Sequence, residues 1–361
     1  MADSTTTTTT KYTNRPIPRI SLRDFDARID AITSALVSAA ETSGFFAVVD
    51  HGIPASAIAA QFSLAEAFFS LPDPVKARVP FSPRSNTGWE RAAQARPSTG
   101  RPDQKESFQV QFGMPESSWP PEPEPESESE VGAGAGGFKQ KTLEFMRLAQ
   151  GVSEKLMVCF ARGLGFPDAY FVRAHDVRRA GAQTVLRLLK YFALDPAAGP
   201  APEGYHRAGA HADWDFVTLL FQRPGQGGLE ICPGREAFTE FGLEDTWTPV
   251  EPVEGEIVCN IGDLLMSWSD DRFKSTFHRV KTPTDPATDY YGTRYSMAYF
   301  NQPNVDCEIQ GPLKKYPMVT GSEFTQAAMK RNYEALQATK AAMVDKTGGE
   351  KGGDLVVAAA A

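Results

Sequence analysis

Apolar residues in the N-terminal half recur at the spacing of amphipathic helices. In the first such segment Ile29, Ile32 and Leu36 fall on one helical face. The second segment stops before Pro72, because proline cannot continue a helical hydrogen-bond pattern. Helices are therefore predicted at residues 24–42, 54–71 and 138–164, and short apolar runs predict strands at residues 17–22 and 45–49.

The C-terminal half changes to the pattern of short strands. Strands are predicted at residues 185–192, 216–221, 229–231, 256–260, 264–268 and 294–300. Turn signals separate them, including the run Pro-Gly-Gln-Gly-Gly at residues 224–228. Strands of this length and spacing are typical of a double-sheet jelly roll. The predicted fold class is mainly β with an α cap: a jelly-roll core, or double-stranded β-helix, flanked by N-terminal and C-terminal helices.

Composition divides the chain into regions. Six threonines at Thr5–Thr10 and the absence of a hydrophobic signal core predict a disordered leader over residues 1–15. An acidic stretch rich in proline and glycine, at residues 115–137, cannot bury enough surface to fold and is predicted as a disordered loop. The remaining regions are expected to be an N-terminal part at 16–180, the jelly-roll core at 181–310, a C-terminal helix at 311–345 and a disordered tail at 346–361.

The chain has 361 residues, 41% hydrophobic and 23% charged, which is the profile of a globular protein that can bury a large core. Its formal net charge of −8 provides no broad basic surface for nucleic acid or an anionic membrane. No apolar run approaches the roughly 20 residues of a membrane span, so a cytoplasmic location is expected. The four cysteines lack metal-ligand spacing and are expected to be reduced. A small-molecule partner is expected, with the protein a monomer or a homodimer.

His211, Asp213 and His278, which we call the triad, are the strongest candidates for metal ligands and catalysis. His211 and Asp213 are two residues apart, so on one strand their side chains point to the same side. Two imidazoles and one carboxylate on one face of an Fe(II) ion leave the opposite face open for substrate and dioxygen. The same residue types could hold the zinc ion of a hydrolase, or either histidine could be an ordinary core residue.

Arg294 and Ser296 follow the triad and are again two residues apart, so they share a strand face. An arginine can hold a carboxylate through two parallel hydrogen bonds, and a serine hydroxyl can add a third. An arginine inside a barrel needs an anion, because an unpaired buried charge is costly. The pair therefore predicts a binding site for an organic-acid co-substrate; the alternative is a surface arginine on an edge strand.

These residues belong to a series of motifs that spans nearly the whole chain. The motifs are IPRI at 17–20, GFFAVVDHGI at 44–53, FFSLP at 68–72, HADW at 211–214, GGLE at 227–230, NIGD at 260–263, HRV at 278–280 and RYS at 294–296. Each motif is modest alone, but together and in this order they are specific. The chain resembles the 2-oxoglutarate- and Fe(II)-dependent dioxygenases of the isopenicillin N synthase-like family, its fungal members in particular.

The resemblance implies a role for each matching residue. The triad would bind Fe(II). Arg294, Ser296 and Tyr191 would bind the C5 carboxylate of 2-oxoglutarate, whose keto-acid end chelates the metal. Phe300 would line the substrate pocket. With O2, such an enzyme oxidises an unactivated C–H bond, by hydroxylation, desaturation or oxidative cyclisation.

The substrate is indicated less directly. Residues 84–106 carry several basic side chains, and in relatives this region crosses the mouth of the barrel, so Arg84, Arg91 and Trp89 are candidates for substrate binding. The alternative is a solvated loop that offsets the acidic stretch. Asp215 has the parity of the first two triad residues and could pair with a substrate ammonium group; the alternative is a solvated turn carboxylate. We expect a small, amino-acid-derived carboxylate used in specialised metabolism.

Two other functions fit the same residues. A relative could use O2 without 2-oxoglutarate, in which case Arg294 and Ser296 would hold the carboxylate of the substrate itself. The barrel could also bind a metabolite without turning it over. The intact triad, together with Arg294 and Ser296, argues against a barrel without activity. Decay of 2-oxoglutarate in the absence of substrate would exclude the first alternative.

Overall fold

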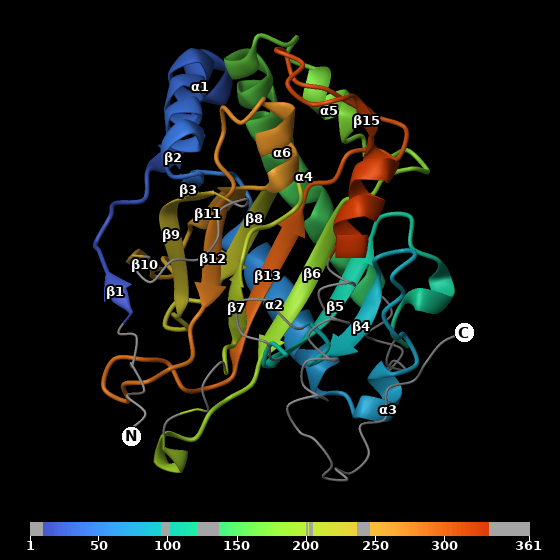
Figure 1. Ribbon diagram of the computed structural model, residues 1–361. Helices are drawn as coiled ribbons and strands as arrows, with labels where there is room; N and C mark the ends of the chain where they lie inside the picture. Colours follow the sequence, from blue (N-terminus) through green and yellow to red (C-terminus); the bar gives the residue numbers. More distant parts are fainter. Residues whose placement is uncertain are drawn as a thin grey trace, which may run out of the picture.

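Two sheets form the centre of the molecule (Figure 1). The computed structural model describes residues 10–94, 102–121, 137–199, 201, 205–236 and 246–331. Within these residues the larger sheet has eight strands in the order β2-β3-β11-β8-β13-β6-β5-β4. The smaller sheet has five strands in the order β1-β10-β9-β12-β7.

The bounds of the elements are as follows. In sheet order, the larger sheet contains β2 (Arg19–Ser21), β3 (Phe45–Val49), β11 (Ile257–Ile261), β8 (Val217–Gln222), β13 (Arg294–Phe300), β6 (Val185–Tyr191), β5 (Lys105–Gln111) and β4 (Gly88–Arg91). The smaller sheet contains β1 (Lys11–Tyr12), β10 (Thr246–Val250), β9 (Leu229–Glu236), β12 (Thr276–Val280) and β7 (Ala208–His211). The short strands β14 (Glu308–Ile309) and β15 (Val319–Thr320) pair with each other. The helices are α1 (Phe25–Thr42), α2 (Ala55–Ser70), α3 (Asp73–Lys76), α4 (Phe138–Leu164), α5 (Tyr170–Ala174) and α6 (Asp263–Trp268), with single turns at Glu116–Ser118 and Pro196–Ala198.

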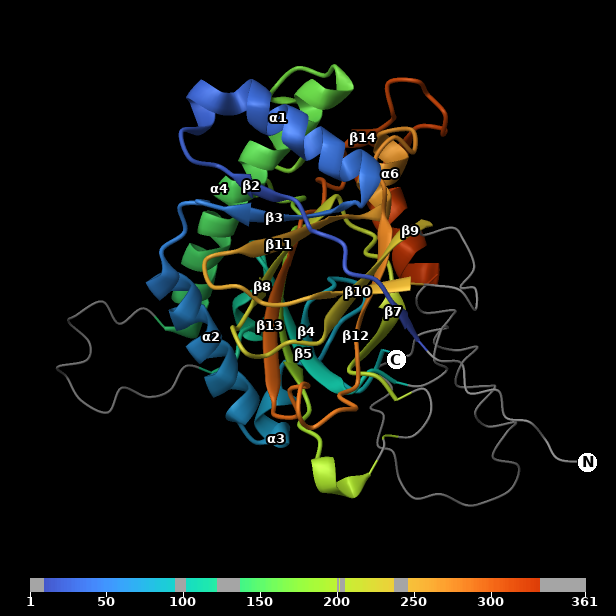
Figure 2. The same ribbon diagram turned by 90° about the vertical axis from the view of Figure 1, so that its left-hand side faces the viewer.

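Helices α2 and α4 cover one face of the larger sheet (Figure 2). The main hydrophobic core lies in this layer and includes Leu186 and Leu188 of β6. The ring of Phe145 on α4 meets that of Phe221 on β8 edge-on, with 5.0 Å between centroids. Burying this apolar surface is the main stabilising contribution to the fold.

The opposite face of the larger sheet packs against the smaller sheet. A second apolar cluster joins Leu189 and Tyr191 of β6 to Ala208 of β7 and Val280 of β12. Because side chains alternate along a strand, the odd-numbered residues of β6 point into the space between the sheets and the even-numbered ones point to the helices. We call this space-facing side of the larger sheet the inner face.

The predicted architecture is confirmed in its main elements. The expected helices correspond to α1, α2 and α4, and the expected strands to β2, β3, β6, β8, β9, β11 and β13. Residues 321–331 are helical, at the start of the predicted C-terminal helix. The rest of that helix, the tail, residues 1–9 of the leader and residues 122–136 of the acidic loop lie outside the described residues. No described helix is both long and apolar enough to cross a membrane.

Three segments differ from expectation. The apolar run at 264–268 is part of helix α6, not a strand, because a fully buried run carries no periodicity that separates the two. Lys11–Tyr12 of the predicted leader forms β1, since backbone pairing with β10 needs no apolar side chains. Part of segment 84–106 forms β4 and the start of β5 at the edge of the larger sheet. The sheet therefore begins well before residue 181.

Candidate active site

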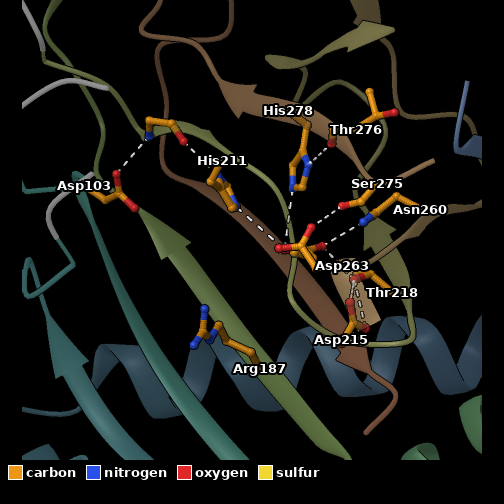
Figure 3. Close-up of polar contacts among 12 residues, drawn as sticks. Asp103, Arg187, His211, Asp215, Thr218, Asn260, Asp263, Ser275, Thr276 and His278 are labelled. Carbon is orange, nitrogen blue, oxygen red and sulfur yellow. Dashed lines mark hydrogen bonds and ion pairs between the residues drawn. The ribbon is translucent and has the colours of Figure 1, made fainter. Parts of the chain in front are cut away.

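The triad assembles where β7 and β12 run side by side. His211 ends β7 and is paired with His278 of the antiparallel strand β12, while Asp213 follows β7. One ligand atom from each residue lies within 4.8 Å of the other two. Asp213 Oδ1 is 3.8 Å from His211 Nε2 and 3.7 Å from His278 Nε2. Figure 3 shows the imidazoles of His211 and His278 near each other, and these two distances place Asp213 between them. The structure therefore brings together the candidate metal ligands that the sequence predicts.

Backbone carbonyls orient both imidazoles. His211 Nδ1 lies 2.7 Å from the carbonyl oxygen of Gly209, and His278 Nδ1 lies 3.3 Å from that of Thr276. A proton on each Nδ1 leaves the Nε2 lone pair directed at the common centre, as a metal ligand requires. Phe45 packs its ring edge against His278, with 5.6 Å between centroids.

Two neighbouring strands hold the Asp213 carboxylate in place. Asp213 Oδ2 accepts hydrogen bonds from Thr218 Oγ1 at 2.7 Å and from Asn260 Nδ2 at 2.9 Å. Thr218 and Asn260 are themselves cross-strand partners on β8 and β11. These bonds occupy Oδ2 and leave Oδ1 facing the two histidines. The sequence alone did not predict that Thr218 and Asn260 orient Asp213, although Asn260 lies in the NIGD motif at 260–263.

Asp215 lies behind the triad instead of on an open surface. It is 1% exposed, and its two carboxylate oxygens lie 3.1 and 3.2 Å from Thr218 Oγ1, whose one O–H group is directed at Asp213. Figure 3 shows it beside Thr218, away from the two histidines. Burial, and next the charge of Asp213, raises the pKa of this carboxyl well above its usual range. Neither the substrate-pairing interpretation nor the solvated-turn alternative places Asp215 in this buried position.

Gly262 permits the close packing beneath the triad. A Cβ atom at this position would lie 2.0 Å from the backbone oxygen of Asp215, so any other residue would push the two segments apart. The next residue, Asp263, donates its backbone N–H to the backbone oxygen of Asp213 at 2.8 Å. Its side chain accepts from Ser275 Oγ at 2.7 Å, and burial raises its pKa to about 6.

Arg294 and Ser296 lie on the inner face, each 1% exposed. Arg294 donates from Nε to the Gln226 carbonyl at 3.0 Å and from Nη2 to Gln222 Oε1 at 2.7 Å. Within the described part of the chain, Arg294 Nη1, Ser296 Oγ and Gln222 Nε2 are buried and have no hydrogen-bond partner. Three unpaired donor groups in one place are expected where an anion binds, because leaving buried donors unpaired is costly.

The charge around these buried donors is positive. The Tyr191 ring packs against the Arg294 guanidinium, with 4.9 Å from Cζ to the ring centroid. A second buried arginine, Arg207, donates to the carbonyl oxygens of Tyr290 at 2.9 Å and Gly292 at 2.6 Å. Burial, and next the charge of Arg294, lowers the pKa of Arg207 to about 10. Both guanidiniums would therefore be stabilised by a bound carboxylate, and the donor set fits one.

The remaining substrate candidates are spread over two faces of the sheet. Phe300 at the end of β13 lies beside the inner-face apolar cluster. Trp89 instead donates its indole N–H to Glu106 Oε2 at 2.9 Å, among the helix-facing side chains. Arg91 is exposed and bonds to Asp73 Oδ2 of α3 at 2.6 Å, and Arg84 is exposed in the turn before β4. The structure does not bring Arg84, Trp89 or Arg91 to the triad.

Comparisons with known proteins agree with this site. Two family models match the chain: one described as non-haem dioxygenase in morphine synthesis N-terminal, over residues 17–128, and the 2OG-Fe(II) oxygenase superfamily, over residues 184–303. A proline hydroxylase of Petromyces alliaceus is 30% identical over 309 residues, which is 81% of this chain and 89% of that protein. The chain belongs to the 2-oxoglutarate- and Fe(II)-dependent oxygenase superfamily. The oxygenase is also 28% identical, over 318 residues, to a 2-oxoglutarate-dependent dioxygenase of Penicillium crustosum, covering 82% of this chain and 88% of that one.

A solved structure extends the likeness to the co-substrate. Neurospora crassa T7H in complex with α-ketoglutarate and thymine superposes with a TM-score of 0.72 at 27% identity, covering 88% of this oxygenase and 96% of that chain. α-Ketoglutarate is 2-oxoglutarate. The predicted fold class, family and enzyme type are confirmed, as is the use of Fe(II), 2-oxoglutarate and O2.

Proposed function

We propose specific residue roles for this 2-oxoglutarate-dependent oxygenase. His211, Asp213 and His278 hold Fe(II) through Nε2, Oδ1 and Nε2. Arg294 and Ser296, assisted by Tyr191 and by Gln222, hold the C5 carboxylate of 2-oxoglutarate. The observation that carries this assignment is the set of buried donors at Arg294 Nη1, Ser296 Oγ and Gln222 Nε2, which have no partner among the described residues.

The protein contributes binding and orientation. Bound Fe(II) and 2-oxoglutarate supply the oxidising chemistry, in which O2 oxidises a substrate C–H bond and converts 2-oxoglutarate to succinate and CO2. Asn260 and Thr218 fix the direction of the Asp213 carboxylate, and the carbonyl groups of Gly209 and Thr276 fix the two imidazoles. Arg294 then sets the distance between the distal carboxylate and the triad, because its own position is locked by Gln222 and Gln226.

The proposed substrate is a small, amino-acid-derived carboxylate of specialised metabolism. Support comes from the similar Petromyces alliaceus protein, which is a proline hydroxylase. The Neurospora crassa T7H structure contains thymine, a small heterocycle, so a compact cyclic substrate is a second candidate that the same fold accommodates. We propose hydroxylation, desaturation or oxidative cyclisation as the outcome, a cytoplasmic location, and a monomer or homodimer that acts on neither nucleic acid nor membranes.

Succinate formation tests the proposed roles. Protein loaded anaerobically with Fe(II) is given 2-oxoglutarate and air with a panel of amino acids, beside the variants Arg294→Ala and Arg162→Ala. Arg162 is a matched control because it pairs with Asp30 and Asp168 on the outside of α4. Substrate-stimulated succinate is expected in the wild type and in Arg162→Ala, and its loss is expected in Arg294→Ala.

Other outcomes would favour the two alternatives. Oxygen uptake with a substrate but without succinate would indicate an oxidase that does not use 2-oxoglutarate. No 2-oxoglutarate decay and no oxygen uptake with any compound would indicate a binding protein. Unchanged succinate formation in Arg294→Ala would place the co-substrate carboxylate elsewhere.

A further inference from the structure

A second polar pair lies on the inner face, separate from the residues assigned to 2-oxoglutarate. Gln109 of β5 and Arg187 of β6 are cross-strand partners. Gln109 Oε1 accepts from Arg187 Nε at 3.0 Å and from Nη2 at 2.6 Å. These two bonds use one edge of the guanidinium and fix its plane. The amide acts here as a neutral support for the cation.

Gln109 also carries a buried donor. It is 1% exposed, and its Nε2 has no hydrogen-bond partner among the residues that the structure describes. The bonds to Arg187 take its amide oxygen, so the amide nitrogen points away from that contact. A buried amide N–H group without an acceptor is unusual, which indicates that an acceptor comes from a ligand.

The pair lies on the inner face, next to an aromatic ring. Figure 3 shows Arg187 extending from β6 on the side of the sheet where His211 lies. The Arg187 guanidinium also covers the Phe300 ring, with 5.4 Å from Cζ to the centroid. A cation, an amide N–H group and an aromatic ring therefore lie together on the inner face.

This pair is separated from Arg294 along the sheet. In the β6–β13 register Arg294 is opposite Tyr191, and Arg187 lies four residues along β6 from Tyr191. At the rise of a strand, four residues span roughly 13 Å. The C5 carboxylate that we assign to Arg294 therefore leaves Arg187 and Gln109 for a different group.

We propose that Arg187 and Gln109 form the binding site for the carboxylate of the prime substrate. Arg187 donates to one carboxylate oxygen and Gln109 Nε2 to the other, while Phe300 packs against the carbon skeleton. This rests on the proposed function and deepens it, because it assigns the substrate's acid group to a defined place. A neutral amide of the same skeleton presents one acceptor and one donor, so it fits this pair less well.

Matched pairs of ligands test the assignment. The panel contains amino acids, their N-acetyl derivatives and the corresponding carboxamides, given to the Fe(II)- and 2-oxoglutarate-loaded protein. Binding is measured anaerobically by isothermal titration calorimetry, and turnover in air by succinate formation. Acids should bind and stimulate succinate formation, with the matching amides weaker by roughly 10- to 100-fold, as the loss of a hydrogen bond between charged groups predicts.

Three variants of the pair and one control variant separate the effect of charge from that of geometry. Arg187→Gln should raise KM for acids by roughly 10- to 100-fold, with little change for amides. Arg187→Lys keeps the charge but not the bidentate edge, so an intermediate KM is expected. Gln109→Glu keeps the size of the side chain and can pair with Arg187, but its charge repels a carboxylate. Acids should therefore bind this variant more weakly, while the KM for 2-oxoglutarate should stay unchanged. Arg162→Gln removes an arginine from the outer surface and should match the wild type.

Several results would overturn the proposal. These are amides that bind as well as their acids, a panel in which no acid binds, and equal losses for acids and amides in Arg187→Gln. A raised KM for 2-oxoglutarate in Arg187→Gln, with substrate binding unchanged, would assign Arg187 to the co-substrate instead. The calorimetry is independent of turnover, so acid-selective binding without succinate would support this site while contradicting the proposed reaction.

Discussion

Asn260 donates its side-chain amide to Asp213 Oδ2 at 2.9 Å, which joins a strand of the larger sheet to the segment that follows a strand of the smaller one. Asn260 belongs to β11 of the larger sheet, and Asp213 follows β7 of the smaller one. This bond, shared with Thr218, turns the other carboxylate oxygen toward His211 and His278. The larger sheet thus orients a candidate metal ligand in the segment that follows β7 of the smaller sheet.

Replacing Asn260 should therefore weaken metal binding without removing a ligand. Asn260→Ala removes one of the two side-chain donors that hold Asp213 Oδ2, and we expect the affinity for Fe(II) to fall by about 10- to 100-fold. Isothermal titration calorimetry with Fe(II) under anaerobic conditions measures the change in affinity. Circular dichroism checks that the fold is intact. An unchanged Fe(II) affinity in a folded variant would show that Thr218 alone is sufficient to orient the carboxylate.

Gln222 should control the affinity for 2-oxoglutarate through Arg294. Gln222→Leu removes the amide oxygen that accepts from Arg294 Nη2, and it removes the buried Nε2 donor that we assign to the 2-oxoglutarate carboxylate. The loss of these two bonds, each worth about 1 kcal/mol, predicts a rise in KM for 2-oxoglutarate of roughly 10- to 30-fold. The affinity for Fe(II) is expected to stay the same. A variant that loses Fe(II) affinity but keeps the KM for 2-oxoglutarate would contradict the assignment.

The sequence predicted those parts of the site in which the residues of a pair are close neighbours along the chain. His211 and Asp213, and likewise Arg294 and Ser296, are two residues apart, and the two-residue period of a strand places each pair on one face. The unusual residue types then indicated the chemistry. In the structure His211 and Asp213 lie together with His278, and Arg294 lies against Tyr191.

The supporting residues could not be predicted in the same way, because each acts across a strand boundary. Asn260 pairs with Thr218, and Gln109 pairs with Arg187. The register between strands depends on the packing of the whole sheet, so residue spacing along the chain does not reveal these neighbours. Helix α6 was mistaken for a strand for a related reason, since its apolar run is buried on all sides.

The stability of the fold should depend strongly on the charge balance of the buried pair Asp103 and Lys105. Lys105 Nζ donates to Asp103 Oδ2 at 2.7 Å, and Asp103 Oδ1 accepts the backbone N–H of Gly209 at 2.9 Å, two residues before His211. Asp103→Asn keeps a side-chain oxygen that can accept the Gly209 N–H, but it removes the negative charge beside the buried Lys105 ammonium. We therefore expect the free energy of unfolding to fall by about 3–5 kcal/mol. Urea denaturation measures this.

The double variant Asp103→Asn with Lys105→Met is the matched control for that experiment. Removing both charges avoids the stranded ammonium, so most of the lost stability should return. If the double variant is as unstable as Asp103→Asn alone, the loss comes from the changed contact with Gly209 and not from the charge.

His175 should make stability depend on pH between about pH 4 and pH 6.5. It is 1% exposed, and burial lowers its pKa from 6.5 to about 4. The folded protein therefore takes up this proton only below about pH 4, whereas the unfolded chain takes it up below about pH 6.5. In that window the unfolded state binds more protons, so the free energy of unfolding falls as the pH falls, by up to about 3 kcal/mol.

Urea denaturation of metal-free wild type and His175→Leu at several pH values isolates this contribution. The stability difference between the two proteins should shrink from pH 7 to pH 4 and then level off, because leucine binds no proton in either state. A difference that stays constant over this range would mean that His175 keeps its ordinary pKa in the fold.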